Sequence, residues 1–347
     1  MKRRDRAYLF SVATLVLAGA SHPSAALEPG QALQTKPGIA IGVTAIPLPA
    51  ALYFVNHNFY YDYRLTGPGV ATVPNAPRGH AEVVDLGLLW VPGWTVLGAT
   101  YSAYVALQYV RQSINSAPSA GFPGVSYQGV HNAFIGPLRL QWSLGHGFYA
   151  QAGIGVYVPT GTISGPLGNS NTGADYFTFQ PNLAFTYLTG TWSFTAYSYY
   201  EHNTRNARSG YRTGDILHVD LTAMGQFGNW TLGPVAYYVR QATSDRSSAT
   251  MDAALTAALS GLEITGFNAG KFESFAVGGL VSYNFGKLFL TVIATNEIFS
   301  RAFGGYSGTP VLSSIPFTNE TTTRGWTVLS RLTYPLWSGP TPALSGR

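Results

Sequence analysis

Apolar and polar residues alternate along the stretch that begins at position 215, "DILHVDLTAMGQFGNWTLGPVAYYVRQ". A period of two residues predicts a β-strand with two unlike faces. A second apolar run begins after Phe-Gly-Asn, which predicts a tight hairpin. The medium that covers the apolar face, a protein core or lipid, decides the class of protein. The two faces of the first strand carry Leu217, Val219, Leu221 and Ala223 on one side and His218, Asp220, Thr222 and Gln226 on the other.

Twelve segments with strand character divide the chain. Most exceed the five or six residues usual for strands in soluble proteins, and they suit tilted strands that cross a bilayer, which need roughly 9–11 residues. The predicted strands are 51–64, 82–91, 94–110, 130–143, 147–158, 176–189, 191–203, 214–227, 229–241, 272–285, 287–300 and 323–336.

The gaps between these segments alternate between short and long. Short gaps lie at 92–93, 144–146, 190, 228 and 286–287, and long gaps at 65–81, 111–129, 159–175, 204–213, 242–271 and 301–322. A soluble β-sandwich has no reason to gather all its long loops at one end. The pattern predicts an all-β protein, a transmembrane antiparallel up-and-down β-barrel of about 12 strands, with 14 as the alternative, with short periplasmic turns and long outer loops.

Six of the seven tryptophans lie beside a short turn or at the end of the last strand, and only Trp326 lies at the opposite end of its strand. Indole rings prefer the membrane–water interface, so these positions predict one aromatic girdle. The alternative is that tryptophans cap a soluble core near its turns. The girdle residues are Trp90, Trp94, Trp142, Trp192, Trp230 and Trp337, and Tyr60, Tyr61 and Tyr63 are candidates for a second girdle.

Charged residues make up only 10% of the chain, against roughly 25% in a typical soluble domain. The polar faces of the predicted strands carry mostly Thr, Asn, Gln, Ser and Tyr, which suits a narrow hydrated lumen with lipid on the other side. The lumen-lining candidates are Asn56, Asn58, Asp62, Arg139, Gln141, Gln180, Asn182, His218, Asp220, Gln226, Glu297 and Arg331. The alternative for each is an interior polar residue that only fills space.

The first 26 residues have a basic start, an apolar stretch and small residues at 24–26, which predict a signal peptide rather than a membrane anchor. The predicted divisions are then 1–26 signal peptide, 27–50 a periplasmic or lumenal segment, 51–337 the barrel and 338–347 a tail. Without the signal peptide the chain keeps 16 basic and 14 acidic residues, so the high overall basicity gives no support to a nucleic-acid partner.

One long gap, 247–266, has Met251, Leu255 and Leu259 at helical spacing. A short outer helix is predicted, which either enters the mouth of the barrel as a constriction or caps its loop. A neighbouring stretch, 199–214, places His202, Thr204, Asn206 and Ser209 close together and resembles the Ser-His-Asn arrangement of outer-membrane phospholipase A. Thr stands where that enzyme needs Ser, so a solvated loop is the preferred interpretation and no catalytic residue is predicted.

No histidine pair has zinc-ligand spacing with further ligands nearby, and no dinucleotide or phosphate-loop motif is present in the sequence. We therefore expect neither a metal site nor a cofactor, and we expect the protein not to be an enzyme.

Several motifs together resemble the MetA-pathway of phenol degradation family: "PTG" at 159–161, "DYFTFQPNLAFTYLTGTWSFTAYSYYEHN" at 175–203 and "SGYRTGDILHVDLTAMGQFGNWTLGPVAYYVRQATSD" at 209–245. The similarity extends over most of 37–336. The family comprises outer-membrane channels related to long-chain fatty-acid transporters. Those transporters have fourteen strands and a larger N-terminal plug, and here a ten-residue tail follows Trp337.

The resemblance implies passive uptake of small hydrophobic or aromatic compounds across the bacterial outer membrane. The expected partners are outer-membrane lipid, such a solute and, during insertion, the barrel-assembly machinery. The alternatives are a non-transporting structural or adhesion barrel and an outer-membrane lipase.

Overall fold

The computed structural model describes residues 27–28, 33–118, 124–163, 172–258, 262–309 and 320–338. Almost all of the ordered secondary structure is antiparallel sheet. Twelve strands form the wall: β1 Ala51–Thr66, β2 Arg78–Val91, β4 Ala99–Ile114, β6 Ala133–Gly145, β7 Phe148–Val158, β8 Thr178–Thr189, β9 Trp192–Asn203, β10 Ile216–Phe227, β11 Trp230–Gln241, β12 Lys271–Asn284, β13 Phe289–Phe303 and β14 Thr322–Ser338. Each corresponds to one of the predicted segments.

Three pairings around the first strands close the sheet into a barrel. The first strand, β1, pairs antiparallel with β14, from Ala51 opposite Ser338 to Thr66 opposite Thr322. On its other side β1 pairs with β2, and β2 pairs with β4, so no edge of the wall is left open. A closed barrel satisfies every backbone group within the wall, which lipid requires. The prediction of an antiparallel up-and-down barrel is therefore confirmed.

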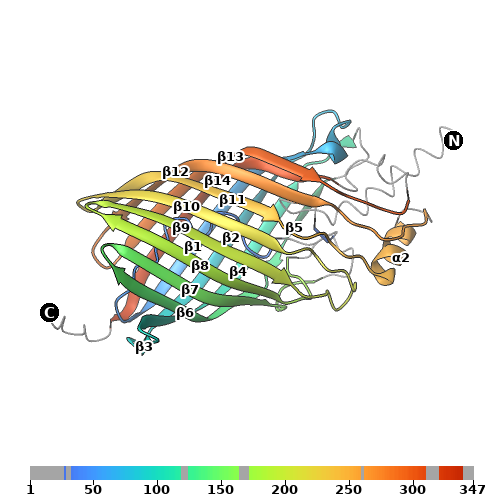
Figure 1. Cartoon of the computed structure of the whole chain (residues 1–347). Helices are drawn as coiled ribbons and strands as arrows, with labels where there is room; N and C mark the ends of the chain where they lie inside the picture. Colours follow the sequence, from blue (N-terminus) through green and yellow to red (C-terminus); the bar gives the residue numbers. More distant parts are fainter. Residues whose placement is uncertain are drawn as a thin grey trace.

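Loops and turns divide between the two ends of the barrel, as Figure 1 shows. One end carries the tight turns, such as the one between β10 and β11 at Gly228, where φ is +62°. The other end carries the long connections, including the 3-10 helix η1 Pro68–Val70 and the helix α2 Ala249–Ala258. This is the predicted arrangement of short periplasmic turns and long outer loops.

The outer face of the barrel is apolar, and β10 shows the contrast most clearly. Leu221 is 44% exposed, whereas His218 and Asp220 are each 1% exposed. Phe179, Leu183 and other large apolar side chains repeat this exposure at alternate positions around the wall. Because such a surface is unfavourable in water, hydrocarbon must cover it. The protein is therefore a β-barrel of the bacterial outer membrane.

The predicted strand over 94–110 is wrong in one detail. The short β3, Thr95–Val96, turns back at Leu97 and Gly98 to pair with the start of β4. Both turn residues have positive φ, +49° and +76°, which suits a two-residue hairpin turn. A further strand, β5 Val125–Val130, pairs with the outer end of β4 within a long connection and was not predicted. These two additions account for fourteen strands in the sheet.

The helix α2 caps its own loop. Met251 and Leu255 are buried in a cluster with Tyr211 and Phe267, and Asp252 accepts hydrogen bonds from the N–H groups of residues 266 and 267. None of the helices in the described ranges is long and apolar enough to span a bilayer. The predicted signal peptide at 1–26, and the tail apart from residue 338, lie outside the described residues.

Candidate functional site: the occupied lumen

A segment that precedes the barrel runs through its lumen. Residues 33–48, which we call the lumenal segment, place backbone groups against side chains of the wall. The N–H of Ala40 donates to Asp220 Oδ2 at 2.9 Å, and the N–H of residue 42 donates to Thr222 Oγ1 at 3.0 Å. Asp220 and Thr222 are successive inward positions of β10, so the strand period matches the spacing of the N–H groups they receive.

The wall also donates hydrogen bonds to the carbonyl oxygens of the lumenal segment. Arg331 Nη1 lies 2.9 Å from the oxygen of Ile41, and Gln141 Nε2 lies 2.9 Å from the oxygen of Ile46. Arg139 Nη2 adds a longer contact of 3.3 Å to the oxygen of residue 44. Buried backbone groups require hydrogen-bond partners. Because the lumenal segment pairs with no strand in the described residues, polar side chains of the wall take that role.

The segment fits closely against the wall at Gly42. Its φ is +78°, and a Cβ there would lie 2.8 Å from Cδ1 of Leu280. Only glycine combines this backbone conformation with so close an approach. Nearer the turn end, the N–H of Ala45 donates to Thr186 Oγ1 at 2.9 Å. The segment is thus held along its length and occupies much of the bore.

The outer mouth holds the first described residues. Glu28 is buried and accepts hydrogen bonds from Asn206 Nδ2 at 3.0 Å and from the hydroxyl of Ser209. Burial raises the pKa of Glu28 to about 8, although these hydrogen bonds oppose the rise. Close by in the same loops, Asp245 accepts hydrogen bonds from the Tyr211 hydroxyl at 2.6 Å and from the Gln241 amide, and burial raises its pKa to about 7. The mouth therefore carries two carboxyls that readily hold protons.

A chamber remains beside the lumenal segment, with a volume of about 340 Å³. Five tyrosine and phenylalanine rings line it together with aliphatic, polar and charged side chains, and the hydroxyls of Tyr104 and Tyr199 are buried with no hydrogen-bond partner among the described residues. A charged group borders the same space: Arg331 Nε lies 2.8 Å from His57 Nε2, and His57 Nδ1 lies 3.3 Å from Asp85 Oδ2. The chamber could hold one small, mostly apolar molecule and offer it a few polar contacts.

Of the predicted lumen residues, most point inward. The structure brings Asn182 together with Gln151 and Tyr197 through side-chain hydrogen bonds of 3.2 and 3.0 Å. Glu297 lies nearer the outer end, where it receives hydrogen bonds from Tyr61 and Tyr237. The inward set is Arg139, Gln141, Gln180, Asn182, His218, Asp220, Glu297 and Arg331.

Three predicted lumen residues on β1 instead face outward. Their neighbours at odd positions, from His57 to Tyr63, are the buried ones, and this places Asn56, Asn58 and Asp62 on the outer side. The outward amides satisfy one another: Asn58 Nδ2 donates to Asn56 Oδ1 at 2.8 Å, and Asn56 Nδ2 donates to a backbone carbonyl of β2 at 3.1 Å. Polarity alone therefore assigned the wrong face on this strand. Gln226 is exposed at the β10–β11 turn, where it bonds the carbonyl of residue 228.

Several lumen residues were missed, among them His57, Asp85, Tyr104 and Tyr199. The regular placement of rings at odd positions of β1 was a usable signal, because a strand with aromatic residues on one side and small amides on the other can bury the aromatic side. The contacts of the lumenal segment left no such signal, because they join residues up to 292 positions apart.

The predicted tryptophan girdle residues all lie near the turn end. Five of them are exposed on the outer face: Trp90, Trp94, Trp192, Trp230 and Trp337. The ring centroids of Trp90 and Trp94 are 5.1 Å apart. Trp142 is half-buried, with its Nε1 donating to the Leu97 carbonyl at 3.0 Å. Tyr61 and Tyr63 of the suggested second girdle are buried in the lumen, whereas Tyr60 forms an aromatic pair with Trp326 near the outer end, with ring centroids 5.4 Å apart.

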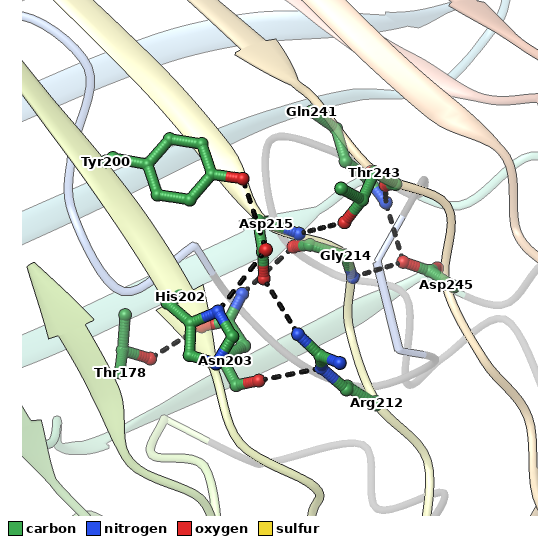
Figure 2. Close-up of polar contacts among 10 residues, drawn as sticks. All are labelled: Thr178, Tyr200, His202, Asn203, Arg212, Gly214, Asp215, Gln241, Thr243 and Asp245. Atoms are coloured by element: carbon green, nitrogen blue, oxygen red, sulfur yellow. Dashed lines mark hydrogen bonds and ion pairs between the residues drawn. The ribbon is translucent and has the colours of Figure 1, made fainter.

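The candidate enzyme residues do not assemble. Figure 2 shows His202 turned toward Asp215, with Nδ1 at 3.3 Å from Oδ2, alongside Tyr200 and Arg212, which also reach that carboxylate. Thr204 Oγ1 instead accepts a hydrogen bond from the N–H of residue 177 at 3.0 Å. This arrangement ties the outer ends of β9 and β10 to their loop, and among the described residues no Ser or Thr hydroxyl is hydrogen-bonded to His202.

Comparison with known proteins gives a family and a fold. A family model described as "Putative MetA-pathway of phenol degradation" matches residues 64–308. No curated protein matches the chain. An outer-membrane channel from Pseudomonas putida F1 is 14% identical, covers 86% of this chain and 99% of its own, and has a TM-score of 0.62, which shows a shared fold.

Two further solved structures are less similar. A FadL homologue from Pseudomonas aeruginosa is 9% identical, covering 82% of this chain and 90% of its own, with a TM-score of 0.40. The toluene transporter TbuX from Ralstonia pickettii is 10% identical, covering 90% and 98%, with a TM-score of 0.34.

Proposed function

Because this chain belongs to the MetA-pathway of phenol degradation family, whose model matches residues 64–308, we propose that it is an outer-membrane channel for passive uptake of small hydrophobic or aromatic compounds. The observation that carries the proposal is the chamber of about 340 Å³, which lies inside the wall and is lined largely by aromatic and apolar side chains. Its size suits one small ring compound rather than a long chain.

The lumenal segment controls passage in this proposal. It is anchored by hydrogen bonds from its backbone to Asp220, Thr222 and Thr186, and in the described residues it pairs with no strand of the wall and is joined to it only where the chain enters β1 at Ala51. We propose that small displacements of residues 33–48 open the chamber toward the periplasm. A solute then moves down its concentration gradient, and the rings and hydroxyls offer it weak successive contacts.

A disulfide tether tests the role of the lumenal segment. The chain has no cysteine, so Ala45→Cys with Thr186→Cys introduces one pair at the point where the Ala45 N–H lies 2.9 Å from Thr186 Oγ1. Whole-cell uptake of a radiolabelled monoaromatic compound is the readout, in a strain that lacks the natural protein. Uptake should fall when the pair is oxidised and recover on reduction, while uptake by each single cysteine variant should not respond to the redox state.

The occupied lumen favours a second candidate, a barrel that has a structural or adhesive role and no transport. That candidate predicts equal uptake with and without the protein, and no effect of the tether in either redox state. Equal uptake in the wild-type and deletion strains across a panel of aromatic and alkyl compounds would remove the channel proposal. We propose no catalytic role.

A further inference from the structure

Three arginines lie side by side on the outer face of the barrel, at the end that carries the long loops. Arg64 on β1 is directly opposite Arg324 on β14 and directly opposite Arg78 on β2. Residues opposite each other in an antiparallel pair point to the same face of the sheet. Arg64 and Arg78 are exposed, whereas Tyr63 and Gly79 beside them are buried, so the row faces outward.

The row has no internal counter-ion. Within the described ranges, no carboxylate lies within 4.0 Å of a nitrogen of Arg64 or Arg78. Arg324 donates to the carbonyl oxygens of Glu297 and Ile298, at 3.0 and 2.6 Å, and these are neutral groups. Like charges directly opposite each other destabilise a sheet. An anion from outside the chain would therefore stabilise the three adjacent guanidiniums.

The level of the row identifies the source of that anion. Two residues closer to the bilayer centre along each strand lie Trp326 and His80, both opposite Asp62. Tyr60 lies two residues further in, opposite Val328 and Glu82, and its ring centroid is 5.4 Å from that of Trp326 and 6.1 Å from that of His80. Exposed Trp and Tyr rings mark the headgroup level of a membrane. Asp62 shares this level and makes no ion pair within the described residues. The arginine row lies just beyond, at the depth of lipid phosphates.

We propose that Arg64, Arg78 and Arg324 bind the phosphate groups of the phosphorylated glycolipid that forms the outer leaflet of the outer membrane. Guanidinium groups bind phosphate oxygens through paired hydrogen bonds, which suits a row of them better than isolated ammonium groups. The aromatic level beneath gives the sugar rings of the glycolipid an apolar surface. Bound glycolipid relieves the repulsion within the row and fixes the seam where β14 meets β1.

Native mass spectrometry of the purified, folded protein with diphosphorylated lipid A tests the site. The double variant Arg64→Gln/Arg78→Gln should weaken retention of this lipid by about tenfold or more, because each basic residue near a lipid surface contributes on the order of 1 kcal/mol. Arg64→Lys/Arg78→Lys keeps the charge without the paired geometry and should lose part of the binding. The matched control is Arg208→Gln, in an outer loop, whose partner is Asp175 at 2.9 Å. Heat-modifiable gel migration establishes whether each variant is folded. If the double variant does not fold, lipid retention is measured for Arg78→Gln alone.

Two comparisons identify the ligand. Lipid A without phosphates should bind about as weakly to the wild type as diphosphorylated lipid A does to the double variant, and millimolar inorganic phosphate should compete poorly with the lipid. Equal retention of the diphosphorylated lipid by wild type, variant and control would overturn the proposal. So would equal competition by inorganic phosphate, which would indicate an adventitious ion only. A change in oligomeric mass on substitution, without a change in lipid retention, would assign the row to a protein interface instead.

Discussion

The guanidinium of Arg331 on β14 donates a hydrogen bond of 2.9 Å from Nη1 to the carbonyl oxygen of Ile41, across 290 positions of sequence. Its Nη2 reaches the carbonyl oxygen of Ile39, and its Nε lies 2.8 Å from His57 Nε2. One buried side chain thus links the last strand, the first strand and the lumenal segment. Its planar fork reaches the carbonyl groups of the two residues on either side of Ala40 at once, which a lysine ammonium does not do.

Substitution Arg331→Met should loosen the lumenal segment while leaving the wall closed. Two charge-assisted hydrogen bonds to the segment are lost, and each such bond contributes about 1.5–3 kcal/mol. We expect faster permeation of a small neutral solute in a liposome-swelling assay, and faster proteolysis within residues 33–48. Arg139→Met, which removes one weaker contact of 3.3 Å to the segment, should have a smaller effect. Unchanged protease protection in the Arg331 variant would show that other contacts hold the segment.

The pH should control how firmly the outer mouth holds its first residues. Burial raises the pKa of Glu28 from its ordinary value of 4.5 to about 8. A carboxyl whose pKa is raised in the docked state favours docking at low pH, and that contribution is lost as the pH rises from about 4.5 through about 8. Hydrogen–deuterium exchange around residue 28, corrected for the intrinsic rate, should therefore show weaker protection at pH 9 than at pH 6.

The variant Glu28→Gln provides the control for this pH effect. An uncharged amide keeps the size of the side chain and can still accept from Asn206 and Ser209, so protection should stay nearly constant between pH 6 and pH 9. An equal loss of protection in both proteins would assign the effect to Asp245 or to another group of the mouth.

The wall of the barrel could be predicted from the sequence because its information is local. A strand that separates lipid from a hydrated lumen must alternate apolar and polar residues, as Leu217 and His218 do. The lengths of the loops alone distinguish the two ends of the barrel. On β1 the rule assigned the wrong face, because Tyr61 and Tyr63 are large rings that belong in the lumen with polar partners, while Asn58 faces outward. The two-residue period of a strand shows which residues share a face. It does not show which face points into the lumen when both faces mix polar and apolar groups.

The site was harder to predict than the wall. The lumenal segment has no strand pattern, and its position is set by contacts such as Ala40 with Asp220, 180 residues apart. The strand β5 was not predicted because it lies within a long connection and does not cross the membrane. Pairings at such distances depend on the closed shape of the barrel, which no short window of sequence contains.

A charge on the outer face should cost stability in proportion to its depth. Leu221→Arg places a guanidinium near the middle of the apolar belt, where the cost is about 2–4 kcal/mol. Phe227→Arg places the same group on β10 beside the periplasmic turn, where the cost is about 0–1 kcal/mol. Both residues are about half exposed in the absence of lipid, at 44% and 51%. Urea unfolding from phospholipid vesicles measures the difference, and equal destabilisation would contradict a bilayer around this face.

Glu297 should be the most sensitive polar residue of the outer half of the lumen. Its carboxylate accepts hydrogen bonds from Tyr61 at 2.6 Å, the N–H of Gly325 at 2.8 Å, Ser274 at 2.9 Å and Tyr237 at 3.0 Å. It therefore joins β13 to four other strands, at the level where β13 and β14 stop pairing with each other after Asn296 opposite Trp326. Removing the carboxylate leaves several buried donors without their acceptor.

Substitution Glu297→Leu should lower the free energy of unfolding by about 2–5 kcal/mol, because each buried donor left unpaired costs about 1–3 kcal/mol and some donors find other partners. Glu297→Gln keeps one acceptor oxygen and should lose less. The matched control is Asn296→Leu, one residue earlier on β13, whose side chain is exposed on the lipid face and whose replacement should be neutral or stabilising. Urea unfolding in vesicles, followed by tryptophan fluorescence, compares the three. If Glu297→Leu and Asn296→Leu unfold at the same urea concentration, the four hydrogen bonds contribute nothing measurable to holding these strands together.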